Sequence, residues 1–198
     1  LVMCLACFFA VVPETQAAAP RDAAAFADTL IERVGMRRGL ALVLGNDGNV
    51  PLELARGSEL LVHVRDPNRK SITALRKQAD EAGLDIQRLT AETGTLSRLP
   101  HADNMVDLVL TTRASGKLLG ELKASEVLRV LRPEGQAIFG AAGDVDAATL
   151  TAWAKKSAAQ DVKSWKDDDG VWIGFTKPPM KGAGDWSHWE HGPDNNPV

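Results

Sequence analysis

Five short runs of aliphatic and β-branched residues alternate with helix-like runs between Gly39 and Gly140, and this alternation constrains the fold most. The apolar runs cover residues 40–45, 59–65, 85–91, 106–112 and 135–140. Each has the length of one buried strand, and glycine, proline or aspartate marks the junctions. Strands that alternate with helices in this way predict a parallel sheet with helices packed on it.

The intervening runs have the spacing of amphipathic helices. Residues 21–37 place Phe26, Leu30, Ile31 and Val34 on one face. Further helices are predicted over residues 53–56, 67–82 and 118–131. The last of these should end before Pro133, because proline cannot continue a helix.

The pattern changes after Gly140. A helix is predicted over residues 144–158, followed by two period-two runs, 161–165 and 171–176, around a turn that contains Gly170. Such a pair is typical of a β-hairpin. The sequence therefore predicts an α/β fold with a doubly wound, Rossmann-like, seven-stranded sheet, mostly parallel with a terminal antiparallel hairpin.

Composition and local sequence divide the 198 residues into three parts. With 44% hydrophobic residues, the chain can bury one core. Residues 1–20 are interpreted as a signal peptide and spacer, residues 21–177 as the main domain, and residues 178–198 as a linker and the start of another domain.

The apolar run at residues 1–12, followed by Pro13 and the alanines at 17–19, is typical of a signal peptide. It is too short to span a bilayer, so we expect export to the periplasm or the extracellular space, with no stable membrane span after cleavage. A buried amino-terminal helix is the alternative. Cys4 and Cys7 lie inside this run, which argues against a metal or redox role for them.

The charge of the chain argues against a nucleic-acid partner. The formal net charge is −3, from 23 basic and 26 acidic residues, and no long basic cluster occurs. Proteins that bind nucleic acids usually carry a basic patch.

A parallel sheet of this kind binds its ligand at the carboxyl ends of its strands. The loop after the first strand reads Gly45-Asn46-Asp47-Gly48, and its glycines would let the backbone approach an anion or a nucleoside. A plain strand-to-helix turn is the alternative, because two glycines are a weak signal.

Asp66 follows the second strand directly, where an acid can accept hydrogen bonds from a ribose diol. The alternative is that Asp66 caps the helix that begins at Pro67, and the two roles are compatible.

Other polar residues carry weaker signals. Thr111 begins a hydroxyl-rich loop after the fourth strand, which could line a nucleoside pocket. His63 and His101 have no visible catalytic partner. His188 and His191 are three residues apart, but Gly192 and Pro193 break a helix there, so no metal site is expected.

Two stretches resemble the class I S-adenosylmethionine-dependent methyltransferases. Residues 99–110, LPHADNMVDLVL, resemble the family's loop and fourth strand, and residues 127–139, VLRVLRPEGQAIF, resemble its helix, turn and fifth strand. With the terminal hairpin, the resemblance covers residues 21–177. It implies S-adenosylmethionine as the cofactor and a small molecule or a protein as the methyl acceptor, whose identity the sequence does not disclose.

The family's glycine-rich loop is only partly present. Gly45 matches its first glycine, whereas Val43 replaces the preceding acid, and Asp47 and Asn49 replace the other two glycines.

The remaining cofactor contacts are carried over by position. Asp66 matches the acid that binds the ribose, Thr95 stands where the family has an acid near the adenine amino group, and Leu96 would pack against the ring. The cofactor-binding residues expected from the loops and the resemblance together are Gly45, Asn46, Asp47, Gly48, Asp66, Thr95, Leu96 and Thr111.

Residues 185–196, DWSHWEHGPDNN, resemble the first strand of a pyrroloquinoline-quinone-type β-propeller. This implies a propeller domain in the same chain.

Two functional hypotheses follow. The first is a methyltransferase that binds S-adenosylmethionine or a related nucleoside near Gly45, Asp66 and Thr95. The second is a non-catalytic binding or docking module of an exported propeller protein, which the incomplete glycine loop and the expected export favour. A nicotinamide-dependent oxidoreductase is weaker, because it does not explain the terminal hairpin.

Overall fold

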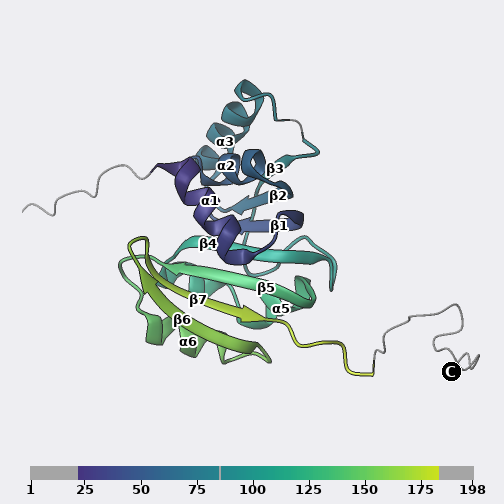
Figure 1. Ribbon diagram of the computed structural model, residues 1–198, viewed down its shortest axis with the longest axis vertical. Helices are drawn as coiled ribbons and strands as arrows, with labels where there is room; N and C mark the ends of the chain where they lie inside the picture. Colours follow the sequence, from purple (N-terminus) through teal and green to yellow (C-terminus); the bar gives the residue numbers. More distant parts are fainter. Residues whose placement is uncertain (1–21, 85, 183–198) are drawn as a thin grey trace, which may run out of the picture.

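The computed structural model describes residues 22–84 and 86–182 and contains one mixed sheet of seven strands (Figure 1). The strand order is β3-β2-β1-β4-β5-β7-β6. The first five strands are parallel to one another, whereas β7 is antiparallel to both β5 and β6. The strands are β1 (Arg38–Leu44), β2 (Glu59–Asp66), β3 (Leu89–Thr93), β4 (Val106–Ala114), β5 (Leu131–Ala141), β6 (Gln160–Asp167) and β7 (Gly170–Thr176). The predicted fold class is confirmed.

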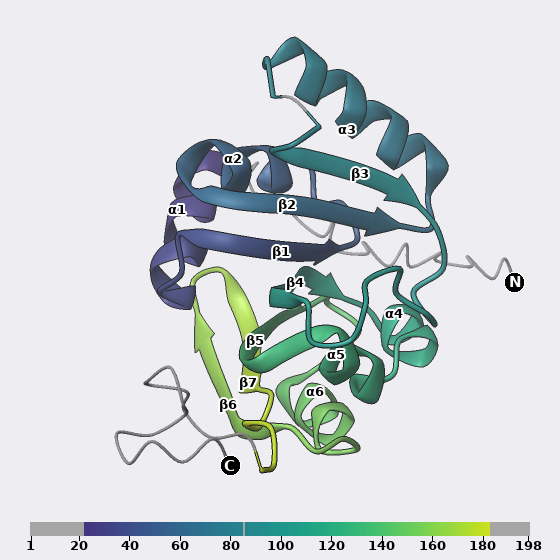
Figure 2. The same cartoon turned by 90° about the vertical axis from the view of Figure 1, so that its right-hand side faces the viewer.

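Helices cover both faces of this sheet. The helices are α1 (Ala23–Val34), α2 (Val50–Gly57), α3 (Arg69–Glu81), α4 (Gly116–Glu121), α5 (Ala124–Val130) and α6 (Ala147–Ala154). The first three pack on one face and the last three on the other (Figures 1 and 2). The parallel strands point the same way, so their carboxyl ends lie along one edge of the domain.

Strand alternation divides the core into two clusters. Ala41 and Val43 of β1 face the cluster under α1–α3, whereas Leu42 and Leu44 face the cluster under α4–α6. The expected apolar face of α1 is confirmed, because Phe26, Leu30, Ile31 and Val34 are all buried. Both faces of β1 are therefore apolar, as expected for a central strand.

Most predicted elements differ in their bounds by a few residues, and three differences are informative. Strand β3 begins at Leu89, not at residue 85. The predicted helix over residues 118–131 is two helices, α4 and α5, because the backbone of Leu122 is extended. The Leu122 carbonyl then accepts a hydrogen bond of 2.9 Å from the indole of Trp153. Helix α2 begins at Val50, and Pro51 lies in its first turn, where a missing N–H costs nothing.

A partly buried ionic network ties α5 to the loop before β4. Arg129 donates to Glu126 at 2.7 Å and to Asp103 at 2.6 Å, and also to the carbonyl oxygens of Leu99 and His101. Burial alone would raise the pKa of Glu126, but hydrogen bonds from Arg129 and from the Leu99 N–H outweigh burial and lower it. The network joins the two stretches that resemble the methyltransferases.

Asp107, at the start of β4, connects three strands. One carboxylate oxygen accepts the Leu40 N–H at 2.8 Å, and the other accepts from Arg132 at 2.5 Å. Gly39 lies against the Asp107 side chain, and a Cβ at Gly39 would be 2.7 Å from the Asp107 carboxylate. Since Gly39 also has φ +129°, only glycine fits this position.

Several expectations concern residues outside the described part of the chain. They are the signal peptide and spacer at 1–20, the cysteines at 4 and 7, the histidines at 188 and 191, and the propeller-like residues 185–196. Within residues 22–84 and 86–182, no helix has the length and apolar character needed to cross a bilayer.

We expect Gly140→Ala to lower the free energy of unfolding by about 1–3 kcal/mol. A Cβ at Gly140 would lie 2.7 Å from the Thr112 carbonyl oxygen and 2.7 Å from the Trp172 ring. Gly120→Ala is the matched control, because nothing lies within 4 Å and α4 should gain about 0.5–1 kcal/mol from alanine. Urea denaturation measures both variants. Wild-type stability of Gly140→Ala would contradict tight packing between β4, β5 and β7.

Candidate functional site

A pocket lies at the carboxyl ends of β1, β2 and β4, where a ligand site is expected in a parallel sheet. Its volume is about 290 Å³. The pocket is lined by Leu44, Gly45, Asn46, Asp47, Asp66, Thr111, Thr112 and Arg113. The structure thus brings together five of the residues singled out from the sequence, namely Gly45, Asn46, Asp47, Asp66 and Thr111.

The turn after β1 exposes backbone towards this pocket. Gly45 has φ +81°, a conformation that glycine adopts without strain. Its N–H donates to the Arg65 carbonyl at 2.9 Å, and the next N–H, of Asn46, donates to the Asp66 carboxylate at 3.0 Å. Gly48, with φ +58°, makes the turn into α2 and does not line the pocket.

Asp66 organises the pocket from the end of β2. One carboxylate oxygen accepts from Asn46 and the other accepts the Asn68 N–H at 2.7 Å. The alternative, that Asp66 caps the following helix, is wrong. Asn68 caps α3 instead, because its side chain accepts from the N–H groups of Lys70 and Ser71. Each Asp66 oxygen keeps a second acceptor position for a ligand.

Asn46 contributes a further acceptor. Its side-chain oxygen is buried and has no hydrogen-bond partner among the described residues. A buried polar atom of this kind is costly unless a water or a ligand satisfies it.

Asp47 bridges the pocket from the first loop to the end of β4. Its carboxylate accepts from the Thr112 hydroxyl at 2.9 Å and lies 3.8 Å from the guanidinium of Arg113. Asp47 stands where the resemblance expects a glycine, so its side chain occupies space that the family leaves open. The volume of about 290 Å³ lies just below the range of about 300–1,000 Å³ for ligand pockets.

Thr95 and Leu96 are not brought together with the other expected residues. Leu96 is only 3% exposed and packs in the core under α4–α6, and its N–H donates to Glu121 at 2.6 Å. The Thr95 carbonyl accepts from Arg65 at 3.5 Å. Neither residue lines the pocket.

Thr112 and Arg113 line the pocket but were not singled out from the sequence. Their only sequence signal is that they follow the fourth apolar run directly. Thr112 and its hydrogen-bond partner Asp47 are 65 residues apart, so no local sequence pattern indicates the contact.

His63 and His101, for which the sequence offered no partner, contact each other. Nδ1 of His63 lies 2.9 Å from Nε2 of His101, and the ring centroids are 4.7 Å apart. Burial lowers the pKa of both rings, and the neighbouring His63 helps to lower that of His101 to about 4. Both side chains are therefore neutral at pH 7. The pair lies outside the pocket at Gly45.

The part of the chain that the structure describes contains no group of three or more histidine, cysteine, aspartate or glutamate side chains arranged to hold a metal ion.

Known proteins share this sequence pattern and this architecture. Residues 43–139 match a family model described as a methyltransferase domain. The matched segment runs from β1 to β5 and so includes the pocket at Gly45. The chain has a methyltransferase-like fold. No curated protein matches it in sequence.

Solved structures agree with this fold. A candidate S-adenosyl-L-methionine-dependent methyltransferase from Methanococcus maripaludis superposes with a TM-score of 0.68 at 16% identity, over 81% of this chain and 87% of the other. The [4+2]-cyclase SpnF gives 0.65 at 17% identity, over 79% and 82%. Phosphoethanolamine N-methyltransferase 2 of Haemonchus contortus, in complex with S-adenosyl-L-methionine, gives 0.61 at 15% identity, over 79% and 53%. At these identities the likeness establishes the fold alone.

We expect His101→Gln to reduce the acid sensitivity of this methyltransferase-like domain. Between the unfolded pKa of about 6.5 and the folded pKa of about 4, the unfolded state binds a proton that folded His101 does not. The free energy of unfolding of the wild type should therefore fall as the pH falls through this window, and the variant should show a shallower slope. Urea denaturation between about pH 7 and pH 5 measures both slopes. Equal slopes would contradict a lowered pKa of His101 in the folded state.

Proposed function

We propose that this methyltransferase-like domain binds S-adenosylmethionine, or a related nucleoside, in the pocket at Gly45 and acts as a methyltransferase on an acceptor that is not identified. The observation that carries the proposal is the Asp66 carboxylate, which lies at the end of β2 beside the turn at Gly45 and Asn46. An acid in this position is suited to accept hydrogen bonds from a ribose diol.

The other pocket residues support a polar, nucleoside-like ligand. The unpartnered oxygen of Asn46 can accept from a ligand hydroxyl or amine. Arg113 supplies a positive charge at the pocket, which suits the carboxylate of an amino-acid group.

For methyl transfer the protein needs mainly to align the methyl donor with the acceptor. The bound cofactor would supply an activated methyl group, which passes to an acceptor nucleophile as the sulfur keeps the electron pair of the broken bond. The residues that line the pocket would hold the two reactants in line, and positioning alone can contribute a large rate enhancement. The absence of a histidine from the lining is compatible with such a reaction.

A second candidate is a domain that binds without transferring a methyl group. The Asp47–Thr112 hydrogen bond favours it, because this contact narrows the pocket where the family has a glycine. Residues 1–19 support export of the chain, to a setting where the cofactor is scarce. The [4+2]-cyclase SpnF illustrates that one fold serves different reactions.

We expect calorimetric titration of S-adenosylmethionine or S-adenosylhomocysteine into the full chain to give saturable binding. Asp66→Ala should weaken it by about tenfold or more, because hydrogen bonds to a carboxylate contribute about 1.5–3 kcal/mol each. Asn68→Ala is the matched control. It removes the cap of α3 and should cost about 1 kcal/mol of stability while leaving the affinity unchanged.

The proposal fails if neither nucleoside binds at millimolar concentration to the wild type or to the widened variant described next. Equal loss of affinity in Asp66→Ala and Asn68→Ala would assign both effects to the local backbone and contradict a ligand role for Asp66.

We expect Asp47→Gly to raise the affinity for S-adenosylhomocysteine, because it removes the side chain that bridges to Thr112 and widens the pocket. The expected gain is about fivefold or more, equivalent to about 1 kcal/mol. Thr112→Val is the control, because it breaks the same hydrogen bond without removing the Asp47 side chain. Binding by Asp47→Gly alone would favour the non-catalytic candidate, whereas weaker binding by Asp47→Gly would make Asp47 a ligand contact.

A further inference from the structure

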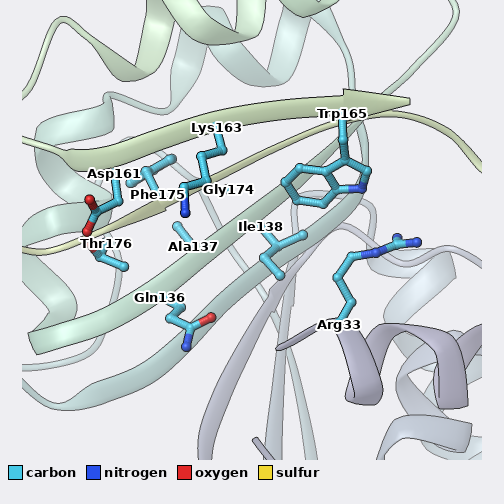
Figure 3. Close-up of a pocket in the computed structure, with 10 residues that line it drawn as sticks. All are labelled: Arg33, Gln136, Ala137, Ile138, Asp161, Lys163, Trp165, Gly174, Phe175 and Thr176. Carbon is cyan, nitrogen blue, oxygen red and sulfur yellow. Dashed lines mark hydrogen bonds between the residues drawn. The ribbon is translucent and has the colours of Figure 1, made fainter. Parts of the chain in front are cut away.

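A second cavity lies beside α1, on the face of β5, β7 and β6 that is turned away from α4–α6, and Figure 3 shows its lining residues. Its volume is about 530 Å³. The lining residues are Arg33, Gln136, Ala137, Ile138, Asp161, Lys163, Trp165, Gly174, Phe175 and Thr176. None of them lines the pocket at Gly45, so this cavity is a separate site.

The wall of the cavity is a fixed aromatic surface. The ring of Trp165 lies against Gly174, where a Cβ would approach it to 3.2 Å, and it stacks on Trp172 with an interplanar angle of 9°. The guanidinium of Arg33 lies over both indoles, at 5.6 and 5.3 Å from the ring centroids. Arg33 is held in turn by Asp167 at 2.5 Å. Trp165 is therefore positioned by packing on one side and by a cation on another.

The cavity has hydrogen-bond donors without acceptors. Among the described residues, Nε1 of Trp165 and Nη1 of Arg33 are buried without a partner. Lys163 is exposed and has no ion pair or hydrogen bond within the described chain, and its amine points into the cavity in Figure 3. The two buried donors favour a ligand that brings acceptors, and the exposed amine of Lys163 is free to pair with an anion.

The acidic groups near the cavity are already engaged. Asp167 accepts from Arg33 and from the indole of Trp172, and Asp161 accepts from the hydroxyl of Thr176 at 3.1 Å. The charge of Arg33 is thus balanced by Asp167, whereas Lys163 forms no ion pair with Asp161, the acid that lines the same cavity. An anion is the complementary ligand for Lys163.

We propose that this cavity is a binding site for a small aromatic carboxylate. The aromatic ring would lie over Ile138 beside the indole of Trp165, and the carboxylate would accept hydrogen bonds from the amine of Lys163. The cavity volume of about 530 Å³ lies within the range of about 300–1,000 Å³ that is typical of small-molecule sites. The inference is independent of S-adenosylmethionine binding, because the two pockets share no residue.

Calorimetric titration of the full chain with 2-naphthoate tests the proposal, and 2-naphthamide serves as the uncharged ligand of matched shape. The carboxylate should bind about tenfold more tightly than the amide, because only the carboxylate forms a charge-assisted hydrogen bond with Lys163. Equal affinities, or no saturable binding of the carboxylate at millimolar concentration, would overturn the proposal.

Two variants on one strand locate the site. Lys163→Gln should reduce the affinity for 2-naphthoate to that for 2-naphthamide. Lys166→Gln should leave it unchanged, because strand alternation places this exposed lysine on the opposite face of β6 from Trp165. Asp66→Ala should also leave it unchanged, which separates this site from the pocket at Gly45. A loss of binding in Lys166→Gln or Asp66→Ala equal to that in Lys163→Gln would place the ligand elsewhere and overturn the proposal.

Discussion

The register of the central strands depends on one carboxylate. Asp107 accepts the Leu40 N–H from β1 and the Arg132 guanidinium from β5, so a single side chain of β4 fixes the amino ends of three strands. Parallel strands of similar length whose amino ends are aligned also have aligned carboxyl ends. The turn after β1 and the residues at the end of β4 consequently face each other, which makes the Asp47–Thr112 contact possible. The pocket at one edge of the sheet thus depends on an ionic contact at the other.

The same argument gives a physical meaning to the two stretches that resemble the methyltransferases. The first contributes Asp103 and Asp107, and the second contributes Arg129 and Arg132. In the structure each arginine pairs with the carboxylate of the other stretch, at 2.6 and 2.5 Å. The two sequence patterns therefore describe a single contact surface between α5, β4 and β5.

The sequence predicted those parts of the fold that depend on local pattern. Runs of aliphatic residues located the strands, and the period of Phe26, Leu30, Ile31 and Val34 located α1. The exchange of capping roles between Asp66 and Asn68 was missed, because both residues have suitable side chains two positions apart. Contacts between distant residues left no pattern: His63 and His101 are 38 residues apart, and Asp47 and Thr112 are 65 apart. The sequence therefore predicted which loops form the candidate site. That Asp47 narrows the pocket could be seen only in the three-dimensional structure.

The pairing of α1 with the terminal hairpin has a consequence for synthesis. Phe26 packs against Trp172 with ring centroids 5.9 Å apart, and Arg33 reaches Asp167 across 134 residues of sequence. During translation α1 emerges from the ribosome before the seven strands, whereas Asp167 and Trp172 in the hairpin emerge after the rest of the sheet. The contacts of Phe26 and Arg33 with the hairpin can therefore form only after most of the domain has been made, whereas the rest of the apolar face of α1 packs on α2, β1 and β2. Closure of this long loop is a late event. A nascent chain that lacks the hairpin would leave this part of the domain incomplete, with apolar surface available to chaperones.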